Sequence, residues 1–192
     1  MPGSSLWLLP PADHPLDSLL TSLIEQTSAH FHSPHLFIPH VTLTSEIASS
    51  AYESNPQQWL DEFKFPKSDL VQVRFESLQS EDVFVRKLYI KVEKGGVIEL
   101  GKVARQAVDG YVEEAAAKRW AEEKYAPHLS LLYHACPKVP EAEIAKIGGL
   151  LQAAGIDLEG QGELGGWEGG RVVLVPTDRP IAEWSPIAER TL

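Results

Sequence analysis

The sequence predicts an α+β protein in which antiparallel sheets are covered by helices. Three observations carry this prediction. Strand and helix patterns alternate along the 192 residues, a helix followed by a histidine-containing strand occurs in both halves, and two neighbouring strands can pair across a short polar turn. The recurrence in both halves suggests two similar lobes. No linker or low-complexity segment divides the chain, so we expect one structural unit, residues 1–192.

The first half of the chain alternates short strands and helices. Residues 6–9 form an apolar strand that two prolines end, and residues 16–27 place apolar side chains at helical spacing. A loop rich in His, Ser and Pro, residues 30–39, leads to a strand at residues 40–45. Pro56 then marks the start of a helix, because proline is favoured at the first helical position.

The second half begins with two strands, residues 70–78 and 83–93, that a polar turn joins. A long helix is expected over residues 97–123, although glycine at position 110 costs about 1 kcal/mol relative to alanine. In the strand over residues 83–93, alternation places four apolar side chains on one face: Phe84, Leu88, Ile90 and Val92. The elements that follow are a strand at 128–133, a helix at 141–154 and a strand at 171–175.

The composition limits the class of partner. Asp and Glu outnumber Lys and Arg by 27 to 17, which gives a formal net charge of −10. An acidic surface repels long polyanions, and the chain has no basic stripe of the kind that follows a phosphate backbone. We therefore expect no long nucleic acid as a partner. A small phosphorylated molecule that enters a narrow groove remains compatible with this charge.

Cysteine usage and hydropathy limit the compartment. Cys136 is the only cysteine, which excludes an intrachain disulfide and a metal site built on thiolates. No stretch approaches the roughly 20 apolar residues that a membrane-spanning helix requires, and the start of the sequence does not have the pattern of a secretory signal. We expect a cytoplasmic protein with no membrane insertion.

The most informative pattern is Pro-His-apolar-Ser/Thr, which occurs at residues 39–42 and again at residues 127–130. Alternate side chains of a strand share a face, so the imidazole and the hydroxyl of each copy project together and the apolar residues project into a core. Two such strands that face each other offer both pairs to one ligand. The candidate site residues are His40, Thr42, His128 and Ser130.

These residue types suit acid–base chemistry on a phosphate ester. Imidazole has a pKa near 6.5, so it can serve as base or as acid near neutrality. Histidines on separate strands can lie on opposite sides of one phosphorus atom, and hydroxyl groups can donate to its oxygens. This chemistry requires no metal and no cofactor, and we expect neither. In the alternative interpretation, both motifs are turns at the start of a strand in which the histidine caps a backbone group.

The motifs resemble those of the two-histidine phosphoesterase superfamily. Within it, the chain is most similar to the fungal 2',3'-cyclic-nucleotide 3'-phosphodiesterases. The resemblance covers nearly the whole chain and is carried by these segments: Leu6–Pro10, Pro39–Thr42, Lys87–Glu93, His128–Tyr133 and Trp167–Gly170. It implies a bilobal pair of antiparallel sheets with a central cleft and helices packed on the outer faces.

The resemblance also implies an activity and a substrate. Members of this family open nucleoside 2',3'-cyclic phosphates to nucleoside 2'-phosphates with the two histidines as an acid–base pair. A further implied substrate is ADP-ribose 1'',2''-cyclic phosphate, a by-product of tRNA splicing, which would yield ADP-ribose 1''-phosphate. The tyrosine at the position of Tyr133 contacts the ligand phosphate in the family. Fungal relatives are associated with the Golgi apparatus, which is the alternative to a cytoplasmic location.

Four aromatic or basic side chains near the motifs are further candidates. Trp7 could stack on a base or a ribose, or it could belong to the core. Tyr133 could contact the phosphate or pack as an ordinary aromatic residue, and strict alternation requires that the strand bends or ends before it. Lys87 and Tyr89 are expected on one face of their strand, where they could line the same groove.

Two rival sites are present in the sequence. His30, His32 and His35 precede the first motif, and neutral imidazoles bind Zn²⁺ or Cu²⁺. No carboxylate lies near them in sequence to orient a ligand shell, so we expect a loop that covers the site and no metal. His134 lies close to Cys136, but no Asn or Asp is placed to complete a thiol triad.

Two alternative functions stay open. One is an RNA-end-processing member of the same superfamily, similar to 2'-5' RNA ligases. The other is a non-catalytic module that binds nucleotides without cleaving them. The acidic chain favours a small cyclic-phosphate nucleotide as the partner, and we expect a monomer.

Overall fold

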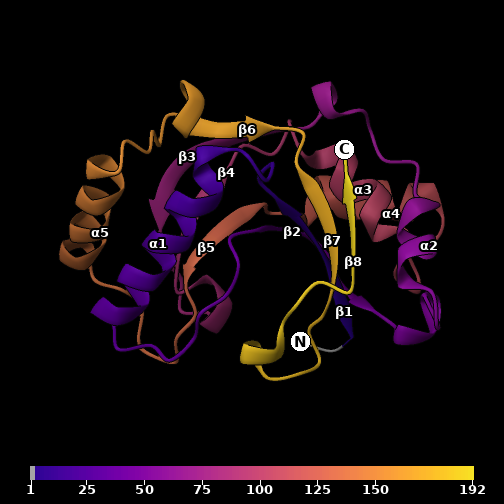
Figure 1. Cartoon of the computed structure of the whole chain (residues 1–192), viewed down its shortest axis with the longest axis horizontal. Helices are drawn as coiled ribbons and strands as arrows, with labels where there is room; N and C mark the ends of the chain where they lie inside the picture. Colours follow the sequence, from indigo (N-terminus) through magenta and orange to yellow (C-terminus); the bar gives the residue numbers. More distant parts are fainter. Residues whose placement is uncertain (1–2) are drawn as a thin grey trace.

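The structure, a computed structural model, describes residues 3–192 (Figure 1). Its centre is an eight-stranded antiparallel sheet in the order β6-β3-β4-β5-β2-β1-β7-β8. The strands are β1 (Ser4–Leu9), β2 (Val41–Ile47), β3 (Gln72–Gln79), β4 (Leu88–Val92), β5 (His128–Leu132), β6 (Gly166–Glu168), β7 (Arg171–Pro176) and β8 (Ala188–Thr191). The predicted α+β class is confirmed.

The two expected sheets are joined edge to edge into one curled sheet (Figure 1). One half consists of β6, β3, β4 and β5, and the other consists of β2, β1, β7 and β8. The two halves meet where β2 lies beside β5, through the pairing of Val41 with Leu129. Each half therefore contributes one motif strand, and the two motif strands are direct neighbours.

Helices cover both ends of the curled sheet (Figure 1). On one side, α1 packs against α5 and β5, and α5 also contacts β3. On the other side, α3 packs against α4 and β2, and α2 contacts β8. The helices are α1 (Pro15–His30), α2 (Pro56–Asp61), α3 (Ile98–Arg105), α4 (Glu114–Glu123) and α5 (Glu141–Ala153). None of the helices in residues 3–192 is long and apolar enough to cross a membrane.

Local sequence signals explain where the helices begin. The His14 side chain caps α1 by accepting from the Leu16 backbone N–H, and Pro15 occupies its first turn. The Asn55 side chain accepts from the Gln58 backbone N–H at the start of α2, where Pro56 is the first helical residue as predicted. These caps satisfy backbone donors that have no partner within the helix.

The prediction of one long helix over residues 97–123 is wrong. The chain forms α3 and α4 there, separated by turns at residues 106–113. Gly110 adopts a φ of 84°, a left-handed conformation that glycine tolerates and a helix does not contain. The periodicity of the two segments favoured one helix, but this turn folds α4 back against α3.

The strand predicted over residues 83–93 is shorter than expected. Phe84–Arg86 form a single 3-10 turn, η3, and β4 begins only at Leu88. Phe84 therefore does not share a strand face with Leu88, Ile90 and Val92, and its side chain is partly exposed. The other 3-10 turns are η1 (Ser49–Ala51), η2 (Ser68–Leu70), η4 (Glu163–Gly165) and η5 (Ile181–Glu183). The strand β8, which forms the far edge of the sheet, was not predicted.

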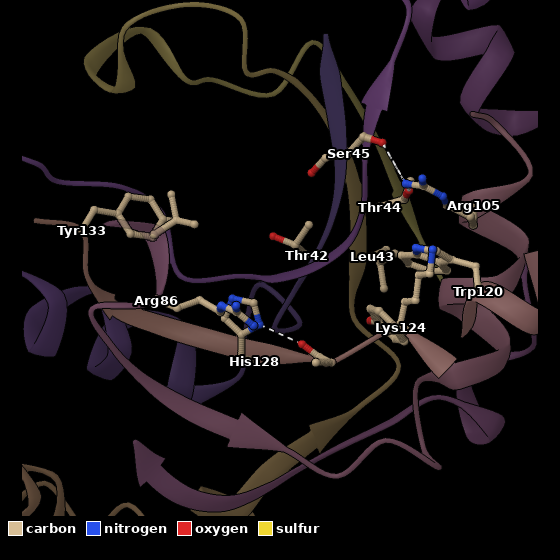
Figure 2. A pocket seen from close by; sticks show the side chains of 13 residues that line it. Thr42, Leu43, Thr44, Ser45, Arg86, Arg105, Trp120, Lys124, His128 and Tyr133 are labelled. Carbon is tan, nitrogen blue, oxygen red and sulfur yellow. Dashed lines mark hydrogen bonds between the residues drawn. The ribbon is translucent and has the colours of Figure 1, made fainter. Parts of the chain in front are cut away.

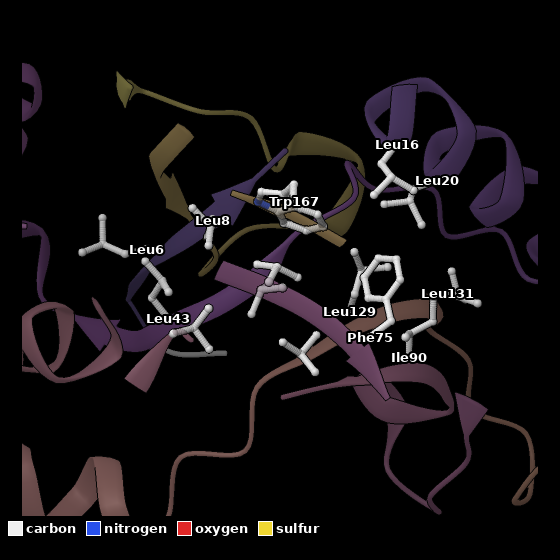
Figure 3. Packing of buried hydrophobic residues seen from close by; sticks show 14 of the residues in the cluster. Leu6, Leu8, Leu16, Leu20, Leu43, Phe75, Ile90, Leu129, Leu131 and Trp167 are labelled. Carbon is white, nitrogen blue, oxygen red and sulfur yellow. The ribbon is translucent and has the colours of Figure 1, made fainter. Parts of the chain in front are cut away.

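One face of the sheet carries the main core (Figure 3). Val41 and Leu43 of β2 are fully buried there with Leu129 and Leu131 of β5. The alternation predicted for both motifs is thus confirmed, because their apolar residues point into this core. The motif histidines and hydroxyls are left for the opposite face.

The register aligns the polar residues of that opposite face. Trp7 on β1 is paired with Thr42 on β2, and Ser130 on β5 is paired with Tyr89 on β4. Paired residues of an antiparallel ladder project to the same side. The opposite face of the sheet therefore carries a row of side chains that runs across both halves and contains both motifs.

Candidate active site

His40 lies at the end of the loop before β2 and is almost fully buried, with 3% of its surface exposed. Its ring stacks on the indole of Trp7, with centroids 3.7 Å apart and planes 9° from parallel. The Nδ1 atom lies 2.7 Å from the carbonyl oxygen of Ile38. Burial lowers the pKa of His40 to about 4; the Ile38 carbonyl opposes the shift, and the charge of His128 adds to it.

His128 begins β5 and is half-buried. Its Nδ1 atom lies 2.8 Å from the carbonyl oxygen of Ala126, and its ring meets the edge of the Tyr89 ring at a centroid distance of 5.3 Å. Burial lowers the pKa of His128, and the guanidinium of Arg86 adds to this. The Ala126 carbonyl and the carboxylate of Glu81 oppose the shift.

The two histidines share one local geometry. In each motif the imidazole Nδ1 contacts the carbonyl of the residue that precedes the proline. A carbonyl oxygen only accepts, so the hydrogen of the neutral ring is assigned to Nδ1 and the lone pair is left on Nε2. Proline fixes the backbone of this Xaa-Pro-His turn. The histidines do contact backbone groups, as the alternative interpretation required, but this bond uses only Nδ1 and leaves Nε2 of each ring without a carbonyl partner.

Tyr133 lies beside His40, although it belongs to the second motif segment. β5 ends at Leu132, which frees Tyr133 from strict alternation, as the sequence required. Its hydroxyl is 3.4 Å from Nε2 of His40, and its ring stacks on Phe37 with centroids 3.8 Å apart. Burial raises the pKa of Tyr133, and a hydrogen bond with Ser130 opposes this. The tyrosine therefore stays protonated and can donate.

The two motif hydroxyls are in different environments. Thr42 is half-buried and lines a pocket of about 270 Å³ together with His128 and Tyr133 (Figure 2). Ser130 is buried, and its hydroxyl donates to the carbonyl oxygen of Val85 at 2.7 Å. Thr42 is thus available to a ligand, whereas the hydrogen of Ser130 is committed to the backbone beside η3.

Trp7 is not placed to stack on a ligand. It is fully buried, stacks on His40 with one face and lies in a small cluster with Leu9, Val173 and Val175. Its indole nitrogen has no hydrogen-bond partner among residues 3–192. The structure therefore assigns to Trp7 a contact with the imidazole and not an open aromatic face.

Lys87 and Tyr89 do not share a strand face as expected, because Lys87 directly follows η3 and only Tyr89 lies in β4. Lys87 is 2% exposed, its ammonium group donates to the exposed Asp82 at 2.7 Å, and it lines neither of the two pockets described. Tyr89 lines a second pocket of about 260 Å³, which adjoins the first at His128 and Arg86. Its hydroxyl lies 2.7 Å from a carboxylate oxygen of Glu81, and burial with this contact raises the pKa of Tyr89 to about 12.

Sequence reasoning missed the cationic and aromatic wall of the first pocket. Arg86, Arg105, Trp120 and Lys124 line it from elements outside both motifs (Figure 2). The signal available was weak: Trp120 and Lys124 end the helix pattern that directly precedes the second motif. Arg86 was visible only as part of a short basic spot.

Arg105 is the most constrained of these side chains. Its guanidinium lies 4.0 Å from the ring centroid of Tyr111 and 4.7 Å from that of Trp120. It donates to Thr44 at 3.3 Å and forms an ion pair with Glu46 at 3.1 Å. Arg105 therefore ties the end of β2, the strand that carries Thr42, to helix α3.

The histidine-rich segment does not gather a ligand shell. His30 is the last residue of α1, and its Nε2 lies 2.6 Å from a carboxylate oxygen of Glu143 on α5. No carboxylate lies near this segment in sequence, but Glu143 approaches it from far along the chain. His35 packs against the edge of Phe84. Within residues 3–192, no group of three or more His, Cys, Asp or Glu is placed to hold a metal ion. Cys136 is a half-buried free thiol.

A family model described as "Cyclic phosphodiesterase-like protein" matches residues 1–192. The chain belongs to this family. It is 56% identical to the 2',3'-cyclic-nucleotide 3'-phosphodiesterase of Phaeosphaeria nodorum over 193 residues, with all of both chains covered. It is 39% identical to the protein of the same name from Neurospora crassa, again over the whole of both chains, and 27% identical to that from Yarrowia lipolytica over 98% of this chain and 99% of the relative. The resemblance inferred from the motifs is confirmed.

Proposed function

We propose that this protein hydrolyses nucleoside 2',3'-cyclic phosphates to nucleoside 2'-phosphates without a metal ion. The observation that carries the proposal is the shared Xaa-Pro-His turn, which leaves Nε2 of His40 and of His128 unprotonated in the neutral rings. Their electrostatic coupling supports a common site. The names of the relatives, which cover the whole chain, support the cyclic nucleotide as the substrate class.

In the proposed reaction the bond between phosphorus and the 3' oxygen breaks, and a bond from phosphorus to a water oxygen forms. One imidazole accepts a proton from the water at Nε2 while the other, as imidazolium, donates its Nε2 proton to the departing 3' oxygen. Attack and departure are roughly in line, so the two bases must act from opposite sides of phosphorus. His40 and His128 then exchange protonation states, and proton exchange with solvent restores the starting form.

Hydroxyl groups supply the proposed contacts to the non-bridging oxygens. Thr42 and Tyr133 both line the pocket that His128 lines, and either can donate to negative charge that develops on phosphate. Ser130 completes this set only if its hydroxyl leaves the Val85 carbonyl when substrate binds. Trp7 acts in this proposal through its stacking on His40, because it is too buried to meet the substrate.

The proposed biological substrate is ADP-ribose 1'',2''-cyclic phosphate, which would be opened to ADP-ribose 1''-phosphate after tRNA splicing. Resemblance to the family supports this, as does the acidic charge of −10, which disfavours RNA ends. A monomer that acts as a single domain, residues 1–192, is part of the proposal, because one chain supplies both imidazoles.

The direct test is product analysis. Incubation with adenosine 2',3'-cyclic phosphate is expected to yield adenosine 2'-phosphate and no 3' isomer, as resolved by chromatography or phosphorus NMR. A product that carries the phosphate on the 3' oxygen would contradict the proposed bond cleavage. Turnover confined to oligonucleotides would support RNA-end processing, and binding without turnover would support a non-catalytic module.

The pH dependence should reflect the depressed histidine pKa values. Both pKa values in the free protein lie below the ordinary 6.5, and that of His40 lies at about 4. The base must be neutral and the acid protonated, so kcat/KM is expected to pass through a maximum below pH 6.5 and to fall by up to tenfold per unit on the alkaline side. The profile of kcat should lie at higher pH, because a bound phosphate anion raises both pKa values.

The same pH series with a chelator separates the two candidate sites. EDTA is expected to leave both profiles unchanged. Strong inhibition by EDTA would instead implicate the histidine-rich segment, and a kcat/KM maximum above pH 7 would contradict the assignment of the two depressed pKa values to the catalytic pair.

A further inference from the structure

We propose that Lys124 binds a second phosphate of the substrate, attached to the 5' side of the ribose that carries the cyclic phosphate. This inference rests on the proposed function and names a specificity residue for it. Lys124 directly follows α4 and lines the pocket that Thr42 and His128 also line. In Figure 2, Lys124 and Trp120 lie on the opposite side of this pocket from His128 and Arg86.

The charges around the pocket single out Lys124. The cations of the neighbouring second pocket are all engaged: Lys91 pairs with Glu76, Arg86 pairs with Glu81, and Lys94 donates to the backbone oxygen of Glu122. Arg105, at the wall of the first pocket, is paired with Glu46. The Lys124 side chain, in contrast, is exposed and forms no ion pair or hydrogen bond with any of residues 3–192.

The pocket is also free of competing anions. No carboxylate is among the residues that line it, although the chain as a whole carries a charge of −10. The second pocket, by contrast, is lined by Glu76 and Glu81. An anionic group therefore meets cations that already have partners on one side of His128 and an unpaired cation on the other, which directs the charged end of a nucleotide toward Lys124.

The arrangement of the pocket fits a nucleotide with two phosphates. Its volume of about 270 Å³ is close to the lower end of the range for small-molecule sites, about 300–1,000 Å³. A cyclic phosphate beside His128 and Thr42 places its ribose between the two sides of the pocket, and the 5' substituent leaves the ribose on the far edge. A 5' phosphate or diphosphate would then reach the ammonium group, with Trp120 beside it as an aromatic wall.

A purely structural role for Lys124 has a different signature. A lysine at the end of a helix stabilises the helix dipole by about 0.3–1 kcal/mol, and that role is indifferent to the ligand. The discriminating quantity is thus the ratio of two affinities, because a change in fold stability affects both equally. Lys118 provides the matched control: it lies on α4, the helix that Lys124 follows, is 63% exposed and lines neither of the two pockets described.

The experiment compares dissociation constants of adenosine 2'-phosphate and adenosine 2',5'-bisphosphate by calorimetry. The bisphosphate is expected to bind the unmodified protein about tenfold more tightly, the size of one charge-assisted hydrogen bond. In Lys124→Gln this ratio should fall toward one, and in Lys118→Gln it should persist. The inference is overturned by equal affinities in the unmodified protein, by a ratio that survives Lys124→Gln, by its loss in Lys118→Gln, or by failure of both nucleotides to bind.

This test is independent of turnover. A protein that binds with the expected ratio but does not hydrolyse adenosine 2',3'-cyclic phosphate would refute the catalytic proposal and retain the subsite. A protein that hydrolyses this substrate but shows no preference for the bisphosphate would refute the subsite and retain the catalytic proposal.

Discussion

Replacement of His128 or of His40 is expected to lower kcat on adenosine 2',3'-cyclic phosphate by about 10²–10⁴-fold. Each imidazole supplies one proton transfer that no other side chain of the site can supply, because the pKa of Tyr133 is raised by burial. The double variant should be little worse than either single variant, since residues that act as a unit are not additive. Steady-state rates at a pH below 6.5 measure the effect.

The choice of variant separates chemistry from folding. His128→Ala is suitable because the ring is half-buried, whereas His40 is packed against Trp7 and is better replaced by Asn. His134→Ala is the matched control, because this histidine lies in the same segment but lines neither of the two pockets described. Circular dichroism should show that all of the variants are folded. An unchanged rate in either site variant would exclude the paired role.

Trp7→Ala is expected to lower the free energy of unfolding by about 3–5 kcal/mol. The indole is fully buried between His40 and the side chains of β7, so its removal leaves a cavity on the site face of the sheet. Trp7→Phe should cost much less, because the indole nitrogen that it removes has no hydrogen-bond partner in the described part of the chain. Urea unfolding of both variants measures these differences.

The same two variants report on His40. Water that enters beside the imidazole reduces the burial that lowers its pKa, so we expect the pKa to rise from about 4 toward 6.5 in Trp7→Ala. An NMR titration of the histidine ring protons would follow this shift. Trp59→Ala, which removes a partly buried indole from α2, is the control and should leave the titration unchanged. A Trp7→Ala protein as stable as its parent would contradict the packing described.

The parts of the fold that local pattern determines could be predicted. Alternation in the two motifs correctly separated Val41 and Leu129, which enter the core, from His40 and Ser130 on the other face. The helix start at Pro56 followed from the preference of proline for the first helical position. In these places the residue and its immediate neighbours decide the structure, so no knowledge of the rest of the chain was needed.

The features that the sequence did not reveal depend on contacts between distant segments. The ion pair of His30 with Glu143 forms only because α1 packs against α5. The bond from Ser130 to the carbonyl of Val85 depends on η3, which replaced the start of a predicted strand. Arg105 reaches the end of β2 because α3 packs against that strand, and it meets Trp120 only because the chain turns at Gly110 and folds α4 against α3. The pattern of side chains along the sequence does not indicate which distant segments pack together.

The Xaa-Pro-His turn separates two properties of each imidazole. The tripeptide aims the ring, because the carbonyl that holds Nδ1 lies only two residues upstream. The low pKa of each ring comes mainly from burial, which Trp7 provides around His40, and the carbonyl of the turn opposes it; Arg86 and Glu81 make smaller contributions at His128. Substitutions in these surroundings can therefore tune the working pH of the site while the reactive nitrogen keeps its direction, which makes pH optimum and catalytic geometry independently adjustable in this protein.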